Sequence, residues 1–148
     1  EAAPLLASAD LPATIFVTTG GIDRRCEFWW DELDRLLLQS NRLPETLRLT
    51  IAGEVVEWHL GSSANYDEGS ARAHRSWRTE EPAPSPRQAL YLALWQRFYS
   101  VSESERQSRL DDLRAWSGSP VASRPARRTM TGAESVARRA GFARRTTA

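Results

Sequence analysis

Residues 11–20 read Leu-Pro-Ala-Thr-Ile-Phe-Val-Thr-Thr-Gly, and this stretch decides the fold class. Its part from Ala13 to Thr19 is short, rich in β-branched residues and apolar in the middle, which is typical of a strand buried on both faces of a parallel sheet. Residues 1–9 before it have the pattern of a helix, which Asp10-Leu11-Pro12 ends. A helix followed by a buried strand is the second half of a βαβ unit, so we expect an α/β fold.

After this strand the sequence predicts a helix, a hairpin and a long loop. Residues 27–40 repeat apolar side chains at helical spacing and carry acids in the first turns, where the helix dipole favours them. Residues 46–60 alternate apolar and polar side chains on both sides of Ala52-Gly53, which predicts a two-stranded antiparallel hairpin. Residues 61–86 are rich in Gly, Ser, Asn and Asp and then in Pro, so we expect a loop there.

The remaining pattern predicts helices over residues 87–99 and 102–116, and a last helix that begins at Thr131. Two of these helix starts carry a capping box, in which a Ser or Thr is followed three residues later by Glu: Ser102 with Glu105, and Thr131 with Glu134.

Charge divides the chain unevenly. The 148 residues hold 20 basic side chains, all of them Arg, and 19 acidic ones, for a formal net charge of +1. Residues 124–148 contain seven Arg and one acid, a net charge of +6, whereas residues 1–123 contain 13 Arg and 18 acids, a net charge of −5. We therefore predict a partial α/β domain over 1–123, with a hairpin and helix-pair insertion over about 44–118, and a separate Arg/Ala-rich segment over 124–148.

The Arg-rich segment has three interpretations. It is a basic arm for an anionic surface or nucleic acid, a solvated disordered tail, or an out-of-frame ending, because shifted GC-rich codons often give Ala and Arg. We favour the out-of-frame ending. A nucleic-acid partner is disfavoured because the segment lacks interleaved aromatic residues and a recognisable motif.

Cys26 is the only cysteine, which excludes an internal disulfide and a metal site built from cysteines. No apolar run approaches the roughly 18 residues that span a bilayer, so we expect no membrane span. The acidic start is not followed by the apolar core of a signal peptide. As given, the chain is expected to be soluble and cytoplasmic.

Two stretches carry a family resemblance. Leu-Pro-Ala-Thr-Ile-Phe-Val-Thr-Thr-Gly (11–20) and Glu-Phe-Trp-Trp-Asp-Glu-Leu-Asp-Arg-Leu (27–36) resemble the second barrel strand of the polysaccharide deacetylases and a segment that follows it in one bacterial branch of that NodB-homology, carbohydrate esterase family. The hairpin, the loop, the helix pair and Arg128-Thr129 keep the family's order, so the resemblance covers most of residues 1–137. It implies an incomplete (β/α) barrel of the polysaccharide deacetylase type with a β-hairpin plus helix-pair insertion.

The resemblance also implies an activity, the metal-dependent hydrolysis of acetyl groups on carbohydrate. In the family, a Thr-Phe-Asp-Asp-Gly motif supplies the general base and a metal ligand, and a His-Ser/Thr-x-x-x-His motif supplies two imidazoles to a divalent metal such as zinc. Neither motif occurs in the 148 residues. We therefore predict no catalytic residue, no metal ligand and no cofactor in this chain, which we interpret as a truncated or frameshifted, catalytically incompetent fragment. The family partner would be an acetylated polysaccharide; the alternative is a non-catalytic glycan- or partner-binding module.

Residues that could replace the missing groups fit structural roles better. The acidic cluster near residue 31 is what an N-terminal helical turn favours, and the one Asp-Asp pair falls within a helix pattern, on a solvated face. Both histidines are expected at the surface, one on the polar face of the hairpin and one between arginines. The residues are Asp31, Glu32, Asp34, Asp111, Asp112, His59 and His74.

Six Trp residues in so short a chain suggest stacking on sugars. Trp77 is the candidate for substrate contact, because it lies in the polar loop between Arg75 and Arg78, although anchoring of the loop is the favoured role. The other five are expected in the core: Trp29, Trp30, Trp58, Trp95 and Trp116. One buried strand and a hairpin cannot close a barrel, so we also expect marginal stability and exposed apolar surface.

Overall fold

The computed structural model describes residues 2–12, 27–119, 124, 129 and 131–134. The chain divides into two compact units, one made of Glu1–Arg25 with Thr129–Ala148 and the other of Cys26–Arg128. The described residues form helices and one small two-stranded sheet, which agrees with the predicted α/β class at that coarse level. The expected strand at 13–19 lies outside the described residues, as do Cys26 and most of 124–148.

In the first unit the structure describes a short helix and one helical turn. Helix α1 (Ala2–Ser8) confirms the predicted N-terminal helix, which ends before Asp10, a residue with the left-handed φ of 50°. The predicted capping box is also confirmed. The Thr131 hydroxyl accepts the N–H of Glu134 at 3.2 Å, and the Glu134 carboxylate accepts the N–H of Thr131 at 2.8 Å.

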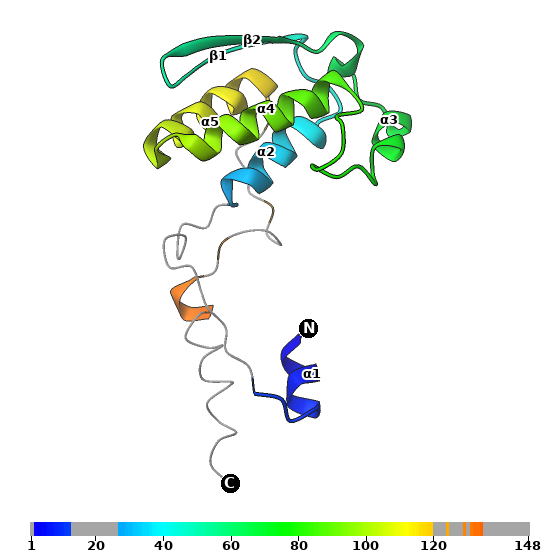
Figure 1. Ribbon diagram of the computed structural model, residues 1–148, viewed down its shortest axis with the longest axis vertical. Coiled ribbons are helices and arrows are strands. Elements are labelled where there is room, and N and C mark those ends of the chain that lie inside the picture. The colour runs from blue at the N-terminus through cyan, green and yellow to red at the C-terminus, as the bar shows by residue number, and fades with distance from the viewer. Residues whose placement is uncertain (1, 13–26, 120–123, 125–128, 130, 135–148) are drawn as a thin grey trace. The chain divides into compact units, whose positions relative to one another are not determined.

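The second unit contains the three longer helices, all of them predicted from the sequence (Figure 1). They are α2 (Trp29–Leu38), α4 (Pro86–Ser100) and α5 (Glu103–Ser117). The Ser102 hydroxyl caps α5 by accepting the N–H of Glu105 at 3.3 Å. Gly118 ends α5 with a φ of 64°, the left-handed conformation that glycine adopts without a steric cost. Helix α2 packs against both α4 and α5.

The predicted hairpin is confirmed as β1 (Thr46–Ile51) and β2 (Glu54–His59), antiparallel, with Leu49 opposite Val56. Ala52 and Gly53 form the turn, both with positive φ. Figure 1 shows the hairpin lying along the helices, and β1 contacts α5. The indole N–H of Trp116 in α5 donates to the carbonyl of Thr46 at 2.8 Å, which fixes the hairpin to that helix.

One apolar core joins these elements. Each of α2, β1, α4 and α5 contributes side chains that are at most 5% exposed. Burial of each large side chain contributes about 1.5–3 kcal/mol, so this unit has a core of its own. The expected marginal stability of the whole chain stays a prediction. The main contributors are Leu33, Leu36, Leu37, Leu47, Leu49, Ile51, Leu90, Leu94, Phe98, Leu110 and Leu113.

The prediction of a structureless loop over 61–86 is wrong in part. The segment contains a 3-10 helix, η2 (Gly61–Ala64), and a short helix, α3 (Glu68–Ala73). The Asp67 carboxylate caps α3 by accepting the N–H of Ser70 at 2.7 Å, and this bond lowers the pKa of Asp67. Helices of four and six residues are too short to produce a recognisable hydrophobic period, which is why the sequence pattern did not reveal them.

Across the part of the chain that the structure describes, no helix is both long enough and apolar enough to cross a membrane.

Candidate functional site

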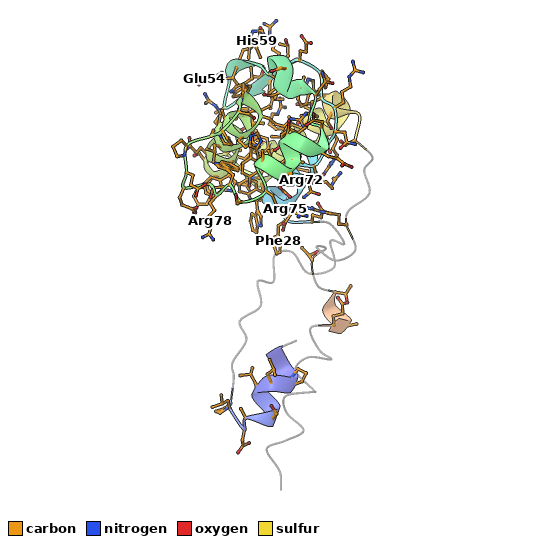
Figure 2. All side chains as sticks on the ribbon, turned by 90° about the vertical axis from the view of Figure 1, so that its right-hand side faces the viewer. Phe28, Glu54, His59, Arg72, Arg75 and Arg78 are labelled. Carbon is orange, nitrogen blue, oxygen red and sulfur yellow. The ribbon has the colours of Figure 1, made fainter. Side chains whose placement is uncertain are left out.

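Two predicted surface groups lie where they were expected. His59 is exposed at the end of β2, with Nε2 3.2 Å from a Glu57 carboxylate oxygen. Figure 2 shows His59 and Glu54 at the opposite side of the larger unit from Phe28. The adjacent acids at positions 111 and 112 are exposed on α5 and pair with arginines of the same helix, so they form the predicted solvated face.

His74 is not a freely exposed side chain, which corrects the surface prediction. It follows α3 and is partly buried, with its ring stacked on Tyr66 at a centroid distance of 5.7 Å. Its Nδ1 lies 2.9 Å from the Tyr66 hydroxyl. The neighbouring Arg72 and Arg75 are exposed (Figure 2) and suggested a solvated position, but His74 between them lies against Tyr66.

Hydrogen bonds join His74 to Tyr66 and Gln88. The Gln88 amide can only donate through Nε2, and it lies 2.8 Å from the Tyr66 oxygen. The Tyr66 hydroxyl hydrogen is then available to Nδ1 of His74, which acts as the acceptor. Nε2 of Gln88 also lies 3.2 Å from Nδ1 of His74, so the three side chains form one hydrogen-bonded cluster.

Arg87 is the buried centre of the same cluster. Its side chain is fully buried at the start of α4, and its Nε and Nη2 donate to the carbonyls of Ser63 and Ala64, both at 2.8 Å. Nη1 donates to the carbonyl of Ser40, after the end of α2. The guanidinium lies over the Tyr66 ring, and burial lowers the pKa of Arg87. Arg87 thus fastens the 61–66 segment to α2 and α4.

Sequence reasoning missed Arg87, although one signal was present. Arg87 precedes the buried Leu90 and Leu94 by three and seven residues, which places it on the same helical face. A charged residue on that face predicts a buried cation with carbonyl or carboxylate partners.

A second cluster is ionic and joins α2 to α5. Glu32 is buried, and its carboxylate accepts Nε and Nη2 of Arg114 at 2.6 and 2.7 Å. It also accepts Nη2 of Arg35 at 3.0 Å. The hydrogen bond with Glu32 raises the pKa of Arg114. Glu32 does occupy the predicted first turn of a helix, but its partner lies 82 positions later, so spacing within the helix could not reveal the pair.

A third cluster holds Arg124, the first arginine of the Arg-rich segment. Glu27 accepts the backbone N–H of Arg124 at 2.6 Å and its Nε at 2.8 Å through one carboxylate oxygen. The other oxygen accepts Nε of Arg35 at 3.3 Å. Burial raises the pKa of Glu27, but the hydrogen bonds from Arg124 and Arg35 together outweigh it, so the pKa of Glu27 is lowered. Arg124 is therefore part of the larger unit.

Five aromatic rings form a continuous series at the N-terminal end of α2 and along α4; we call it the aromatic row. Phe28 stacks on Trp30 with centroids 4.7 Å apart and an interplanar angle of 5°. Trp29 meets Trp30 edge-on at 5.4 Å and Trp95 at 6.1 Å. Trp95 stacks on Tyr99 at 5.7 Å with an angle of 19°. The row is thus two stacked pairs joined by Trp29.

The aromatic row is largely exposed, which corrects part of the tryptophan prediction. Trp30, Trp95 and Tyr99 expose 42%, 38% and 71% of their surface. The expectation that Trp30 and Trp95 lie in the core is wrong, because each sits beside the apolar stripe of its helix and not within it. Trp29, Trp58 and Trp116 are partly buried against the core.

Trp77 has a structural partner at each end of its side chain. Its indole N–H donates to the carbonyl of Pro82 at 3.2 Å, and its ring meets Tyr91 edge-on at 6.3 Å. This geometry agrees with the favoured role as a loop anchor. Contact between its partly exposed ring and a glycan stays a prediction.

The clusters described above were also compared with the ligand sets of metal sites. Within the described residues, no three His, Cys, Asp or Glu side chains gather in a way that could hold a metal ion.

Comparison of the chain with protein-family models, with curated proteins and with solved structures finds no match. The resemblance to the polysaccharide deacetylases therefore rests on the residues quoted above and on their order.

Proposed function

We propose that this chain is a piece of a polysaccharide deacetylase whose accessory insertion extends from the 44–118 expected from the sequence to the whole unit Cys26–Arg128, and that the flanking unit belongs to a (β/α) barrel. The order of the two units supports this proposal. The first unit is built from both ends of the chain, and the second lies between them in sequence, which is the arrangement that an inserted domain produces.

The contact between Glu27 and Arg124 is the observation that carries the proposal. An insertion must leave and re-enter its host at neighbouring points, so its first and last residues have to be close together. Glu27 follows the first residue of the larger unit and binds the backbone of Arg124, four residues before the last. A buried ion pair at this point holds the two ends of the insertion together.

In this proposal the chain does not perform the family reaction on its own. Deacetylation needs a carboxylate as general base and a metal-bound water, and the two motifs that supply them are not among the 148 residues. His59 faces Glu57 at the surface, and His74 is engaged by Tyr66. Neither histidine replaces the missing ligands.

An acetate-release assay tests the incompetence of the chain. The purified 148-residue protein is incubated with acetylated chitooligosaccharides and added Zn²⁺ or Co²⁺, beside an active deacetylase. We expect acetate at the level of the protein-free blank. Metal-dependent release of acetate by this chain, abolished by a chelator, would overturn the proposal.

A second test addresses the family. The coding DNA on both sides is read in every frame. The proposal expects codons for Thr-Phe-Asp-Asp-Gly upstream and for His-Ser/Thr-x-x-x-His downstream. If neither motif is encoded in any frame, the family assignment fails.

The exposed aromatic row favours a second candidate function, a non-catalytic glycan-binding module. This candidate requires no missing motif, and it is compatible with the insertion.

A further inference from the structure

Three exposed arginines lie at intervals of three residues at and after the end of α3; we call Arg72, Arg75 and Arg78 the arginine cluster. Residues 69–79 contain these three arginines and no acidic side chain. The N–H of Arg75 donates to the carbonyl of Arg72 at 3.4 Å, and residues three apart in such a turn lie on the same side. Figure 2 shows the three side chains on the half of the larger unit that lies away from His59.

The guanidinium groups of the cluster have no partner within the described part of the chain, although most arginines there do. Apart from Arg42 and Arg48, the other described arginines bind carbonyls or carboxylates: Arg35, Arg87, Arg97, Arg106, Arg109, Arg114 and Arg124. A free guanidinium presents its donors in a planar fork that matches the oxygens of a carboxylate or phosphate. The cluster therefore presents three anion-binding groups that folding does not use.

The backbone of the cluster is held by the two partly buried side chains that lie between the arginines. Nδ1 of His74 is 2.9 Å from the Tyr66 hydroxyl. The indole N–H of Trp77 donates to the carbonyl of Pro82, and its backbone N–H donates to the carbonyl of His74 at 3.1 Å. The segment is thus ordered before any ligand arrives, which lowers the entropic cost of binding.

We propose that the arginine cluster binds a short acidic segment of a partner protein, in an extended conformation with carboxylates at alternate positions. Residues three apart in a turn of this kind are separated by about 6 Å along the chain, because each residue advances about 2.0 Å. Alternate side chains of an extended strand are about 6.6 Å apart, because each residue advances about 3.3 Å. Three such carboxylates can therefore meet the three flexible arginine side chains in order.

Acidic residues on both sides of the cluster favour a short partner over a long polyanion. Asp67 and Glu68 precede the cluster, and Glu80 and Glu81 follow it. A nucleic acid would extend past the three arginines toward these like charges, whereas a segment with three carboxylates would not. Single-stranded nucleic acids also stack their bases on aromatic rings in a positively charged groove, but Trp77 is partly buried against the core.

Titration of a fluorescently labelled peptide, Gly-Glu-Ser-Glu-Ser-Glu-Gly, with the full 148-residue chain tests the proposal by fluorescence anisotropy. An ionic strength of about 20 mM keeps the screening of exposed charges small. We expect saturable binding that Arg75→Gln weakens about fivefold, the effect of one exposed ion pair. The variant that carries Arg72→Gln, Arg75→Gln and Arg78→Gln together should not bind. The Arg-rich segment 124–148 is unchanged in every variant, so differences between variants do not come from it.

Arg48→Gln is the matched control, because it removes an exposed arginine without a partner from the hairpin, and it should bind the peptide like the unaltered chain. A second peptide of the same composition, Gly-Glu-Glu-Glu-Ser-Ser-Gly, places its carboxylates at consecutive positions, so it should bind about fivefold more weakly. The guanidinium groups removed here have no partner in the fold, so every variant should unfold at the same urea concentration as the unaltered chain.

Four outcomes would overturn the proposal. The first is no change in anisotropy up to about 1 mM protein, a weaker affinity than a specific site would show. The second is equal weakening by Arg48→Gln and Arg75→Gln, which would make net charge the cause. The third is equal affinity for the two peptides. The fourth is tighter binding of a short oligothymidylate that the triple variant abolishes, which would make the cluster a nucleic-acid site. None of these results bears on the deacetylase assignment, because the surface needs neither a metal nor a general base.

Discussion

Glu27 and Arg124 are 97 positions apart in the sequence, yet one carboxylate oxygen of Glu27 accepts both the backbone N–H and the Nε of Arg124. The Glu27 side chain is only 1% exposed, so this is a buried pair, strengthened by Arg35 on the other oxygen. A buried carboxylate is stable only when its oxygens are paired in this way. The two ends of the larger unit are therefore coupled through a single side chain.

Neutralising Glu27 should destabilise the larger unit. Glu27→Gln keeps the shape but leaves Arg35 and Arg124 without their anionic partner, and we expect a loss of about 1–3 kcal/mol in the free energy of unfolding. All six tryptophans lie within 29–116, so urea denaturation followed by tryptophan fluorescence reports on this unit. Asp111→Asn is the control, because Asp111 is exposed, and it should change stability by less than about 0.5 kcal/mol. Equal effects of the two changes would contradict a buried role for Glu27.

The same pair predicts a pH dependence. The folded state lowers the pKa of Glu27 below its ordinary value of 4.5, because the hydrogen bonds from Arg124 and Arg35 outweigh burial. A carboxylate with a depressed folded pKa contributes stability that is fully present above the unfolded pKa and is lost as pH falls through the folded value. The unaltered chain should therefore lose stability below about pH 4.5, and Glu27→Gln should lose less over the same range. Denaturation curves between pH 7 and about pH 3 measure the difference, and parallel losses would argue that Glu27 contributes nothing to it.

The buried guanidinium of Arg87 gives an independent prediction. Arg87→Met retains the apolar stem but removes the guanidinium donor from the carbonyls of Ser40 and Ser63 and leaves that of Ala64 with the N–H of Leu43 alone, so we expect a loss of about 3 kcal/mol. Hydrogen exchange should show the earliest loss of protection in the 61–66 segment. Arg97→Met is the control, since its ion pair with Glu54 is exposed and long at 4.0 Å, and it should cost less than about 1 kcal/mol. If Arg87→Met lowered the free energy of unfolding no more than Arg97→Met and left the hydrogen exchange of residues 61–66 unchanged, Arg87 would not hold that segment against α2 and α4.

The sequence predicted the regular elements of the larger unit because their signals are local. The alternation around Ala52-Gly53 and the cap formed by Ser102 each arise within a few residues, and both are present in the structure. What it missed depends on partners far along the chain. Nothing in the sequence near Glu32 predicts its partner Arg114, which lies 82 positions later. His74 and Tyr66 are only eight positions apart, and their contact depends on the unpredicted helix α3 between them.

The exposure of the tryptophans at the candidate site could not be predicted from local sequence patterns either. A Trp next to an apolar stripe satisfies the same periodic pattern whether it turns inward or outward, so the sequence could not separate Trp95 from the buried Phe98. Trp77 was singled out for its polar surroundings, but its N–H is already bound by Pro82. The exposed series of rings became visible only when α2 and α4 were placed side by side.

The Glu32–Arg114 pair allows a comparison of buried and exposed ion pairs within one helix. Arg114 donates two hydrogen bonds to the carboxylate of Glu32, and both side chains are largely buried. The pair of Arg109 and Asp112, with an N–O distance of 3.0 Å, is more exposed to solvent. A double-mutant cycle with Glu32→Gln and Arg114→Met should give a coupling energy of about 1–3 kcal/mol. The matched cycle with Asp112→Asn and Arg109→Met should give about 0.5 kcal/mol or less, because solvent screens that pair.

The salt response of the two cycles provides the sharper discrimination. Exposed ion pairs are screened by added salt, whereas buried pairs are screened much less. Raising the ionic strength to about 1 M should therefore abolish the Asp112–Arg109 coupling and leave most of the Glu32–Arg114 coupling intact. If both couplings fell together, the contact between α2 and α5 would depend on its leucines alone, and Glu32 would be only another acid in the first turn of α2.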